Sequence, residues 1–73
     1  MNRYRPRYFI GDRVFGHWNG IPFIGSVGND SQISEEEGPR VSVLLDLPII
    51  HNGQTHTVVL VTHQDIKPLK EFK

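Results

Sequence analysis

The sequence predicts an all-β fold, a small and strongly bent barrel built from five short strands. Asn-Gly pairs at 19–20 and 52–53 separate apolar runs. This dipeptide favours the type I′ turn of a β-hairpin, because both central residues take positive φ there. Glycines at positions 16, 25 and 28 remove side chains where two backbones approach each other or where a strand bends to close a barrel.

The composition limits the classes of protein to which the chain can belong. With 73 residues it is expected to form one domain whose core is only marginally sufficient. It has no cysteine, so neither a disulfide nor a thiolate zinc site can stabilise it. Eight basic and eight acidic residues give a formal net charge of zero, which argues against purely electrostatic binding of nucleic acid. No apolar run is typical of a membrane span or a signal peptide, so we expect a cytoplasmic protein with no membrane partner.

The first predicted hairpin joins a strand over Asp12–Trp18 to a strand over Pro22–Gly28. Pro22 fits the start or the edge of a strand, because proline has no N–H to donate to a neighbouring strand. Side chains along a strand alternate between the two faces of the sheet. On the first strand, one face is expected to carry Val14, Gly16 and Trp18, and the other Arg13, Phe15 and His17. On the second strand, Phe23, Gly25 and Val27 are expected opposite Ile24 and Ser26, and one face of this pair is expected to be core and the other partly covered.

Residues 29–39 are expected to form a surface loop, because Ile33 is the one apolar residue among them. Ser34 and Glu37 have the spacing of a capping box, which is typical of a short helical turn. We interpret the three adjacent glutamates at 35–37 as a solvated loop tip and not as a metal site. Neighbouring carboxylates on a loop seldom converge on one ion.

The second predicted hairpin joins Arg40–Ile50 to Gln54–Val61 through the turn at 52–53. This turn places Leu45 opposite Leu60, Leu47 opposite Val58 and Ile49 opposite His56. The expected core face consists of Val41, Val43, Leu45, Leu47 and Ile49. The opposite face is also apolar, and an uncovered apolar patch is typical of a contact surface. The protein-interface candidates on that face are Leu44, Ile50, Val59 and Val61.

The two ends of the chain have different predicted roles. Thr62–Asp65 is expected to form a tight or 3-10 turn before a closing strand over Ile66–Leu69. Residues 1–8 are expected to form a flexible extended arm, because Pro6 blocks a regular helix, and residues 9–73 form the barrel. The arm interleaves basic and aromatic side chains, which can pair with phosphates and stack on bases. Its nucleic-acid-binding candidates are Arg3, Arg5, Arg7 and Tyr8.

Two segments of the chain carry a resemblance to a known class of domain. The first reads Gly11-Asp12-x-Val14-x-x-x-Trp18-x-Gly20-x-Pro22-Phe23-x-Gly25-x-Val27 and resembles the opening of SH3-like barrels of the Tudor, chromo-barrel and PWWP kind. The second, Asp65-Ile66-Lys67-Pro68-Leu69, is similar to the final turn and strand of those barrels, including transcription-associated KOW domains. The resemblance implies a five-stranded SH3-like barrel with a short 3-10 turn before the last strand.

The resemblance also implies an aromatic rim. Tudor-like domains hold methylated lysine or arginine in an aromatic cage through cation–π contacts. By position, Trp18 and Phe23 correspond to two walls of such a cage, and Phe15 to a third. The chain departs from the pattern on its third strand, where Val43 and Leu45 stand in place of another aromatic residue. Packing of the barrel itself is the alternative role for Trp18 and Phe23.

A second resemblance concerns an enzyme. Gly11-Asp12-Arg13-Val14 also resembles the opening of plasmid-type dihydrofolate reductases, small barrels that act as tetramers around a shared pore. Those enzymes carry Val-Gln-Ile-Tyr on a late strand, where this chain reads Val58-Val59-Leu60-Val61. The polar pore residues are absent, and the sequence has no phosphate-binding loop or nucleophile–base set. We therefore expect no enzymatic activity and no cofactor.

The four histidines are not expected to bind a metal ion. They stand at positions 17, 51, 56 and 63, with no close ligand spacing. Zinc and copper sites need several ligands that converge on one point. We interpret these histidines as scattered surface residues.

The sequence therefore predicts a small non-catalytic interaction module. The expected ligand is a protein partner or a second copy of the chain, because a neutral chain with two apolar strand faces favours a mixed interface over a purely electrostatic one. The resemblance to Tudor-like and KOW-like barrels implies a context of nucleic-acid or transcription machinery. A chain of this size is typical of small regulators or inhibitors such as those that phages encode. The alternatives are direct nucleic-acid binding through the basic arm and an oligomeric enzyme similar to the reductases.

Overall fold

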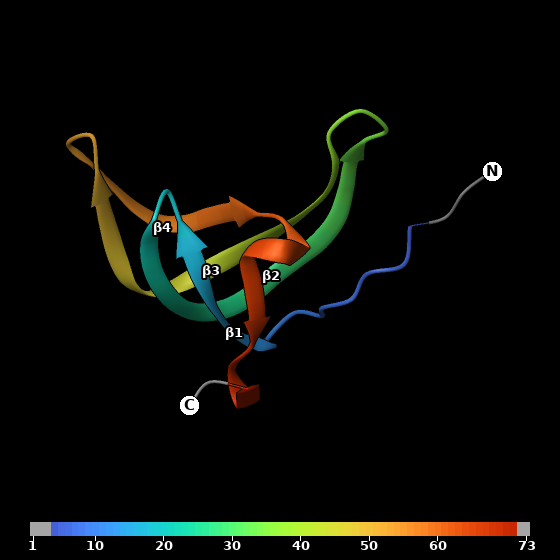
Figure 1. Cartoon of the computed structure of the whole chain (residues 1–73), viewed down its shortest axis with the longest axis horizontal. Coiled ribbons are helices and arrows are strands. Elements are labelled where there is room, and N and C mark those ends of the chain that lie inside the picture. Colours follow the sequence, from blue (N-terminus) through green and yellow to red (C-terminus); the bar gives the residue numbers. More distant parts are fainter. Residues whose placement is uncertain (1–3, 72–73) are drawn as a thin grey trace.

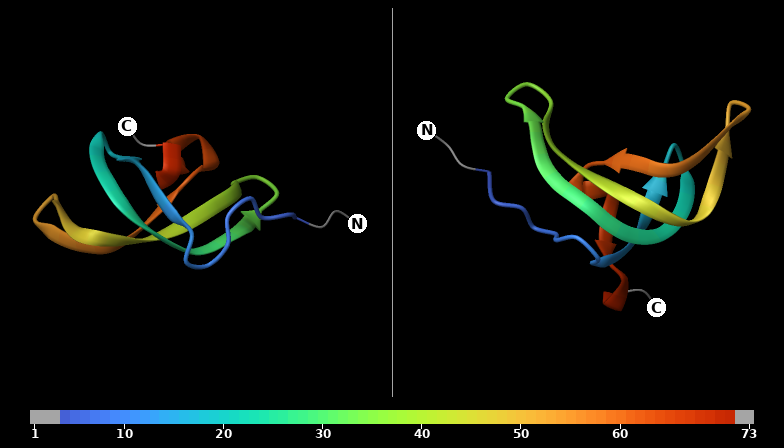
Figure 2. Two further views of the ribbon diagram at one scale, coloured as in Figure 1. Left: turned by 90° about the horizontal axis from the view of Figure 1, so that it is seen from below. Right: turned by 180° about the vertical axis from the view of Figure 1, so that it is seen from behind.

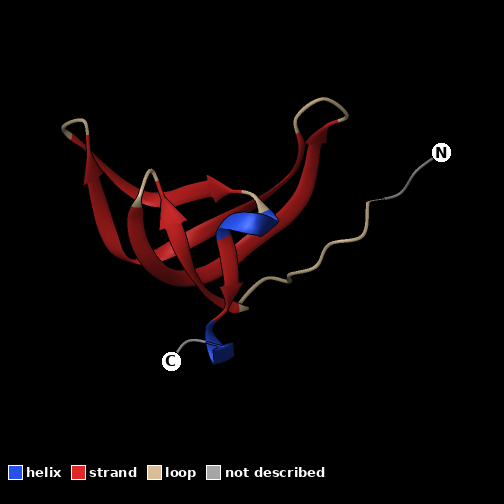
Figure 3. Cartoon of the chain, in the orientation of Figure 1, coloured by secondary structure: helices blue, strands red, loops and turns tan. Residues whose placement is uncertain are grey.

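The structure, a computed structural model, describes residues 4–71 and contains one antiparallel sheet of five strands (Figures 1 and 3). The strands are β1 (Arg13–Trp18), β2 (Ile21–Ser34), β3 (Gly38–His51), β4 (Gln54–Val61) and β5 (Ile66–Pro68). Two short 3-10 turns, η1 (His63–Asp65) and η2 (Leu69–Glu71), follow β4 and β5. The all-β fold class is confirmed, and so is the 3-10 turn before the last strand.

Both Asn-Gly pairs form the predicted two-residue turns. φ is 51° at Asn19 and 77° at Gly20, and it is 51° at Asn52 and 75° at Gly53. Positive φ at both central residues is the requirement of the type I′ turn. The strands on either side of each turn pair directly, which confirms both hairpins.

Two glycines allow close contacts between backbones, as the sequence predicts. A Cβ atom on Gly16 would overlap the carbonyl oxygen of Asp65, and a Cβ atom on Gly25 would overlap that of Leu44. Any other residue at these positions would push the neighbouring segment away. Gly16 therefore brings η1 against β1, and Gly25 brings β3 against β2 where the sheet bends.

The expected loop over residues 29–39 is wrong. β2 continues to Ser34 and β3 begins at Gly38, so the turn between them is short. Most side chains of residues 29–39 are exposed, which accounts for their polar composition. The backbone groups of this segment nevertheless pair between β2 and β3. The capping-box spacing is used at the tip, where the N–H of Glu37 donates to Ser34 Oγ over 3.0 Å.

β3 and β4 do not pair in the continuous register that the sequence predicts. Near the turn, the expected pairing of Ile49 with His56 is confirmed. Residues 45–48 then interrupt the pairing, which resumes with Leu44 opposite Val58. The other two expected pairs are therefore wrong, because an irregularity in one strand changes the face that each residue takes.

This irregularity moves several side chains to the face opposite the predicted one. Val59 and Val61 are predicted on the outer face, but they are 2% and 3% exposed and belong to the core. Leu47 is predicted in the core, but it is 79% exposed. Of the four interface candidates, Leu44 and Ile50 lie on the surface and the two valines do not. The prediction that all four share one uncovered face is wrong.

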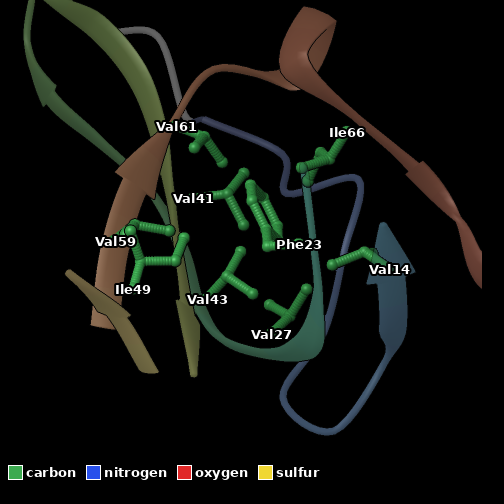
Figure 4. Close-up of a cluster of buried hydrophobic side chains, with 9 residues drawn as sticks. All are labelled: Val14, Phe23, Val27, Val41, Val43, Ile49, Val59, Val61 and Ile66. Carbon is green, nitrogen blue, oxygen red and sulfur yellow. The ribbon is translucent and has the colours of Figure 1, made fainter. Parts of the chain in front are cut away.

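The core consists of nine buried side chains on the inner side of the curved sheet (Figure 4). They are Val14, Phe23, Val27, Val41, Val43, Ile49, Val59, Val61 and Ile66. On β1 and β2 the buried face is the one that carries Val14, Phe23 and Val27. Six of the nine side chains are valines, so the core is thin.

The expected barrel is not closed. The strands are ordered β4-β3-β2-β1-β5, so β4 and β5 form the two ends of the sheet and do not pair within residues 4–71. After β4, the chain turns through η1, and β5 then pairs with β1. The result is an open and strongly curved sheet, which Figure 2 shows from two further sides.

Candidate functional site

A groove lies where β2 and β3 separate. The pairing between these strands starts with Gly25 opposite Leu45, so Ile21–Ile24 pairs with β1 alone. The groove has a volume of about 720 Å³ and runs between the β1–β2 hairpin and the irregular part of β3. Its lining includes Phe15, His17, Pro22, Ile24, Leu47, Pro48 and Ile50.

Two prolines explain why the strands separate there. In a two-residue hairpin, the residues next to the turn exchange hydrogen bonds, and the direction of the backbone groups then alternates along each strand. The backbone nitrogen and carbonyl of Pro22 on β2 are thereby directed away from β1, and those of Pro48 on β3 are directed away from β4. Both prolines therefore face the gap between β2 and β3, and neither has an N–H to bridge it.

The groove is apolar and accessible. Leu47 and Ile50 are 79% and 73% exposed, and Ile24 is also exposed. These three side chains come from two separate strands, yet all line the same groove. A contiguous exposed apolar surface is uncommon on a small chain and is typical of a binding site.

An ion pair fixes one end of the groove. Nη1 of Arg13, on β1, donates to Asp46 Oδ1 and to Ser26 Oγ, each over 2.8 Å, and Nη2 also contacts Asp46. The hydrogen bonds from Arg13 lower the pKa of Asp46. Asp46 lies in the irregular segment of β3, so the pair ties that segment to β1. Both side chains are partly exposed, so solvent weakens the attraction.

A second cluster, centred on Asp30 of β2, holds the N-terminal segment. The carboxylate is buried and accepts hydrogen bonds from the N–H groups of Arg7 and Tyr8, over 2.8 and 3.0 Å, and from the hydroxyl of Tyr4. Nε2 of His63 lies 2.9 Å from Asp30 Oδ2. Burial alone would raise the pKa of Asp30, but these hydrogen bonds outweigh it and lower the pKa.

The aromatic rings around His63 complete this cluster. The ring of Tyr4 stacks on that of His63, with centroids 6.2 Å apart and planes inclined by 7°, and the ring of Tyr8 lies 6.0 Å away. Burial and the neighbouring carboxylate of Asp30 raise the pKa of Tyr4 to about 12. Residues 4–8 are therefore attached to β2 and η1, and their aromatic rings already have neighbours within the chain.

Sequence reasoning missed Asp30 because it placed residues 29–39 in a loop. Val27 and Asp30 are both buried, although they are three residues apart. A regular strand would put them on opposite faces. The register shift between Val27 and Asn29 adds one residue and brings Asp30 back to the inner face. The sequence signal is Gly28, which is typical of such an irregularity.

The aromatic rim predicted from Phe15, Trp18 and Phe23 is not assembled. Phe23 is 7% exposed and lies in the core. Phe15 and Trp18 are three residues apart on β1, so they point to opposite faces of the sheet. Trp18 instead contacts the rings of His51 and His56, with centroids 5.3 and 4.8 Å away.

The nucleic-acid candidates are only partly brought together. Arg3 lies outside the described residues. Arg5 and Arg7 are exposed, and Tyr8 is half-buried. Arg7 and Tyr8 also line a smaller cavity of about 410 Å³, to which η2 contributes Lys70.

Within residues 4–71, no three acidic or histidine side chains gather in a way that could hold a metal ion. The same residues include no helix with the length and apolar character needed to cross a membrane. Comparisons of the chain with protein-family models, curated proteins and solved structures found no match.

Proposed function

We propose that the chain is a small non-catalytic interaction module that binds a protein partner through the groove between the β1–β2 hairpin and β3. The observation that carries this proposal is the exposure of Leu47 and Ile50, at 79% and 73%, on an accessible apolar groove. Burial of such side chains is worth roughly 25 cal/mol per Å² of apolar surface. A protein partner that inserts apolar side chains would remove this surface from water.

The polar residues around the groove supply selectivity. The pair of Arg13 and Asp46 lies at one end, so the groove joins an apolar floor to a charged rim, as protein interfaces do. The resemblance of the first hairpin and the last strand to SH3-like barrels supports a partner in nucleic-acid or transcription machinery. A small regulator of the kind that phages encode is consistent with the proposal.

The experiment that tests the proposal is a pull-down from native lysate with and without nuclease, using the wild-type chain and Leu47→Asp. We expect the wild type to retain a protein after nuclease treatment and Leu47→Asp to lose it. Leu47 is highly exposed, so a carboxylate there is solvated and the fold is retained. Thermal unfolding of both proteins checks this last point.

The matched control is Ile33→Asp, which introduces the same charge at an exposed apolar residue outside the groove. This variant is expected to retain the partner. Loss of the partner from both variants would show that the introduced charge acts without regard to the groove. Retention by Leu47→Asp would contradict the proposal.

Direct binding of nucleic acid is the second candidate, because Arg5 and Arg7 remain exposed although residues 4–8 are attached to the sheet. If these arginines contact phosphates, retention in the pull-down should be lost on nuclease treatment. Affinity for nucleic acid should also fall steeply with added salt, since cationic contacts release counterions. Charge reversal at both positions would then weaken binding.

A further inference from the structure

The outer edge of β4 has no partner strand within residues 4–71. β4 runs from Gln54 to Val61 and lies at one end of the sheet, where it pairs with β3 alone. The β3–β4 hairpin also projects from the rest of the chain in all views (Figures 1 and 2). A row of backbone donors and acceptors is therefore open to another strand.

The residues of β4 do not protect this edge. The strand contains no Lys, Arg, Asp, Glu or Pro, and five of its eight residues are Thr or Val. Soluble proteins commonly protect a free edge with charge, proline or a short strand. The opposite end of the sheet shows these features, because β5 has three residues and includes Lys67 and Pro68. The two ends of the sheet thus differ in their capacity to add a strand.

The direction of the backbone groups identifies where bonds can form. Gln54 pairs with His51 across the two-residue turn, so the next residue, Thr55, directs its N–H and C=O outward. The same alternation, followed from the β1–β2 turn, directs the backbone of Ser42 toward β2. Its partner on β4, Leu60, is therefore directed outward as well, and the irregularity between His56 and Val58 is what places two residues five apart on the same side of the strand.

We infer that a second copy of the chain adds to this edge, with the two β4 strands antiparallel across a two-fold axis. When all eight residues overlap, Thr55 of one chain lies opposite Leu60 of the other. Both residues direct their backbone groups outward, so the two positions form a hydrogen-bonded pair twice in the dimer.

Two features favour a second copy as the occupant. A strand of uncharged residues is complementary to itself when it is antiparallel, and the formal net charge of zero leaves little repulsion between copies. The exposed side chains of Val58 and Leu60 lie along the same edge, with Leu44 opposite Val58 on β3. Pairing through β4 places the apolar patches of the two copies next to each other.

Sedimentation equilibrium of the whole chain over a range of concentrations tests the inference. The wild type is expected to reach twice the mass of one chain. Thr55→Pro removes the outward N–H without removing a bond to β3, and it should raise the dissociation constant at least about tenfold. Thr55→Ala is the matched control, because it keeps the N–H and should still form the dimer.

A second variant covers the case in which proline disturbs the hairpin. Val58→Lys places like charges near the two-fold axis, and Val58 is exposed in the single chain, so the variant should fold and remain a monomer. Ile33→Lys adds the same charge away from the edge and should leave the dimer intact. A wild type that is monomeric at all concentrations would overturn the inference, and so would a Val58→Lys dimer.

Hydrogen exchange separates this interface from any other. In the dimer, the N–H groups of Thr55 and Leu60 should exchange more slowly as the concentration rises, and in Val58→Lys they should exchange rapidly. Doubling of the mass without protection of these two groups would place the contact elsewhere and overturn the inference. Leu47→Asp is expected to form the dimer, so this result and the proposed function can fail separately.

Discussion

At the scale of single residues, Asp30 holds the N-terminal segment against the sheet. Its buried carboxylate accepts the N–H groups of Arg7 and Tyr8 and the hydroxyl of Tyr4, and it contacts His63. A buried carboxylate is stable only when such donors replace water. Residues 4–8 supply these donors, so their hydrogen bonds to Asp30 hold them against β2.

The lowered pKa of Asp30 predicts that the free energy of unfolding decreases at acid pH. Because the pKa in the folded chain lies below its ordinary value of 3.8, the unfolded chain binds the proton first as the pH falls. The stabilisation is present above pH 3.8 and is lost as the pH drops through the folded value. Asp30→Asn should be less stable by about 1–3 kcal/mol at neutral pH.

Urea unfolding of the wild type and Asp30→Asn from neutral to acid pH measures this effect. The difference in unfolding free energy between the two proteins should shrink toward acid pH. Arg13 lowers the pKa of Asp46 as well, but that pair is exposed and its contribution is small. A difference that stays constant with pH would contradict the assignment.

At the scale of elements, the irregular segment of β3 determines which face of β4 is buried. Residues 45–48 have no regular partners on β4, so Val59 and Val61 turn to the core and Leu60 turns outward. Leu47 is released to the groove by the same segment. One local feature thus shapes both the core and the candidate binding surface.

The register predicts opposite results for two aspartate substitutions. Val59→Asp places an unpaired charge in the core and should destabilise the chain by more than about 3 kcal/mol, enough to unfold a domain of this size. Leu44→Asp lies on the outer face and should cost less than about 1 kcal/mol. Circular dichroism and thermal unfolding distinguish the two. A folded Val59→Asp would support the continuous register instead, because that register places Val59 on the outer face together with Leu44.

Asn19-Gly20 and Asn52-Gly53 could be predicted because the turn is determined by two residues that tolerate positive φ. The irregularities at Gly28 and 45–48 could not be located, since they depend on pairing with distant residues. The burial of Asp30, Val59 and Val61 and the exposure of Leu47 follow from these two shifts.

Some features of the groove could also be predicted from the sequence, and others could not. Leu47 was in the predicted core because alternation without an interruption places it there. Pro48 and Pro22 are each recognisable in the sequence as residues that limit pairing. That they face each other across one gap depends on how β2 and β3 lie beside each other. Sequence reasoning therefore identified an apolar surface but not its position.

At the scale of the whole molecule, a thin core makes attached segments important. Within residues 4–71, the core consists of nine buried apolar side chains, mostly valines. A domain of about this size buries only about 60% of its unfolded surface. Contacts outside the core therefore make up a large share of the net stability. The attachment of residues 4–8 to Asp30 and His63 is such a contact.

Removal of residues 1–8 is expected to lower the free energy of unfolding by about 2–4 kcal/mol. The deletion takes away three hydrogen bonds to Asp30 and the aromatic neighbours of His63, and the carboxylate regains water only in part. Arg5→Ala is the control, since Arg5 is exposed, and it should change stability by less than about 0.5 kcal/mol. Urea unfolding at one protein concentration compares the three chains, which keeps any association through β4 equal among them. A deletion as stable as the wild type would mean that the sheet needs no covering at Asp30, and the segment would then be free to serve a partner.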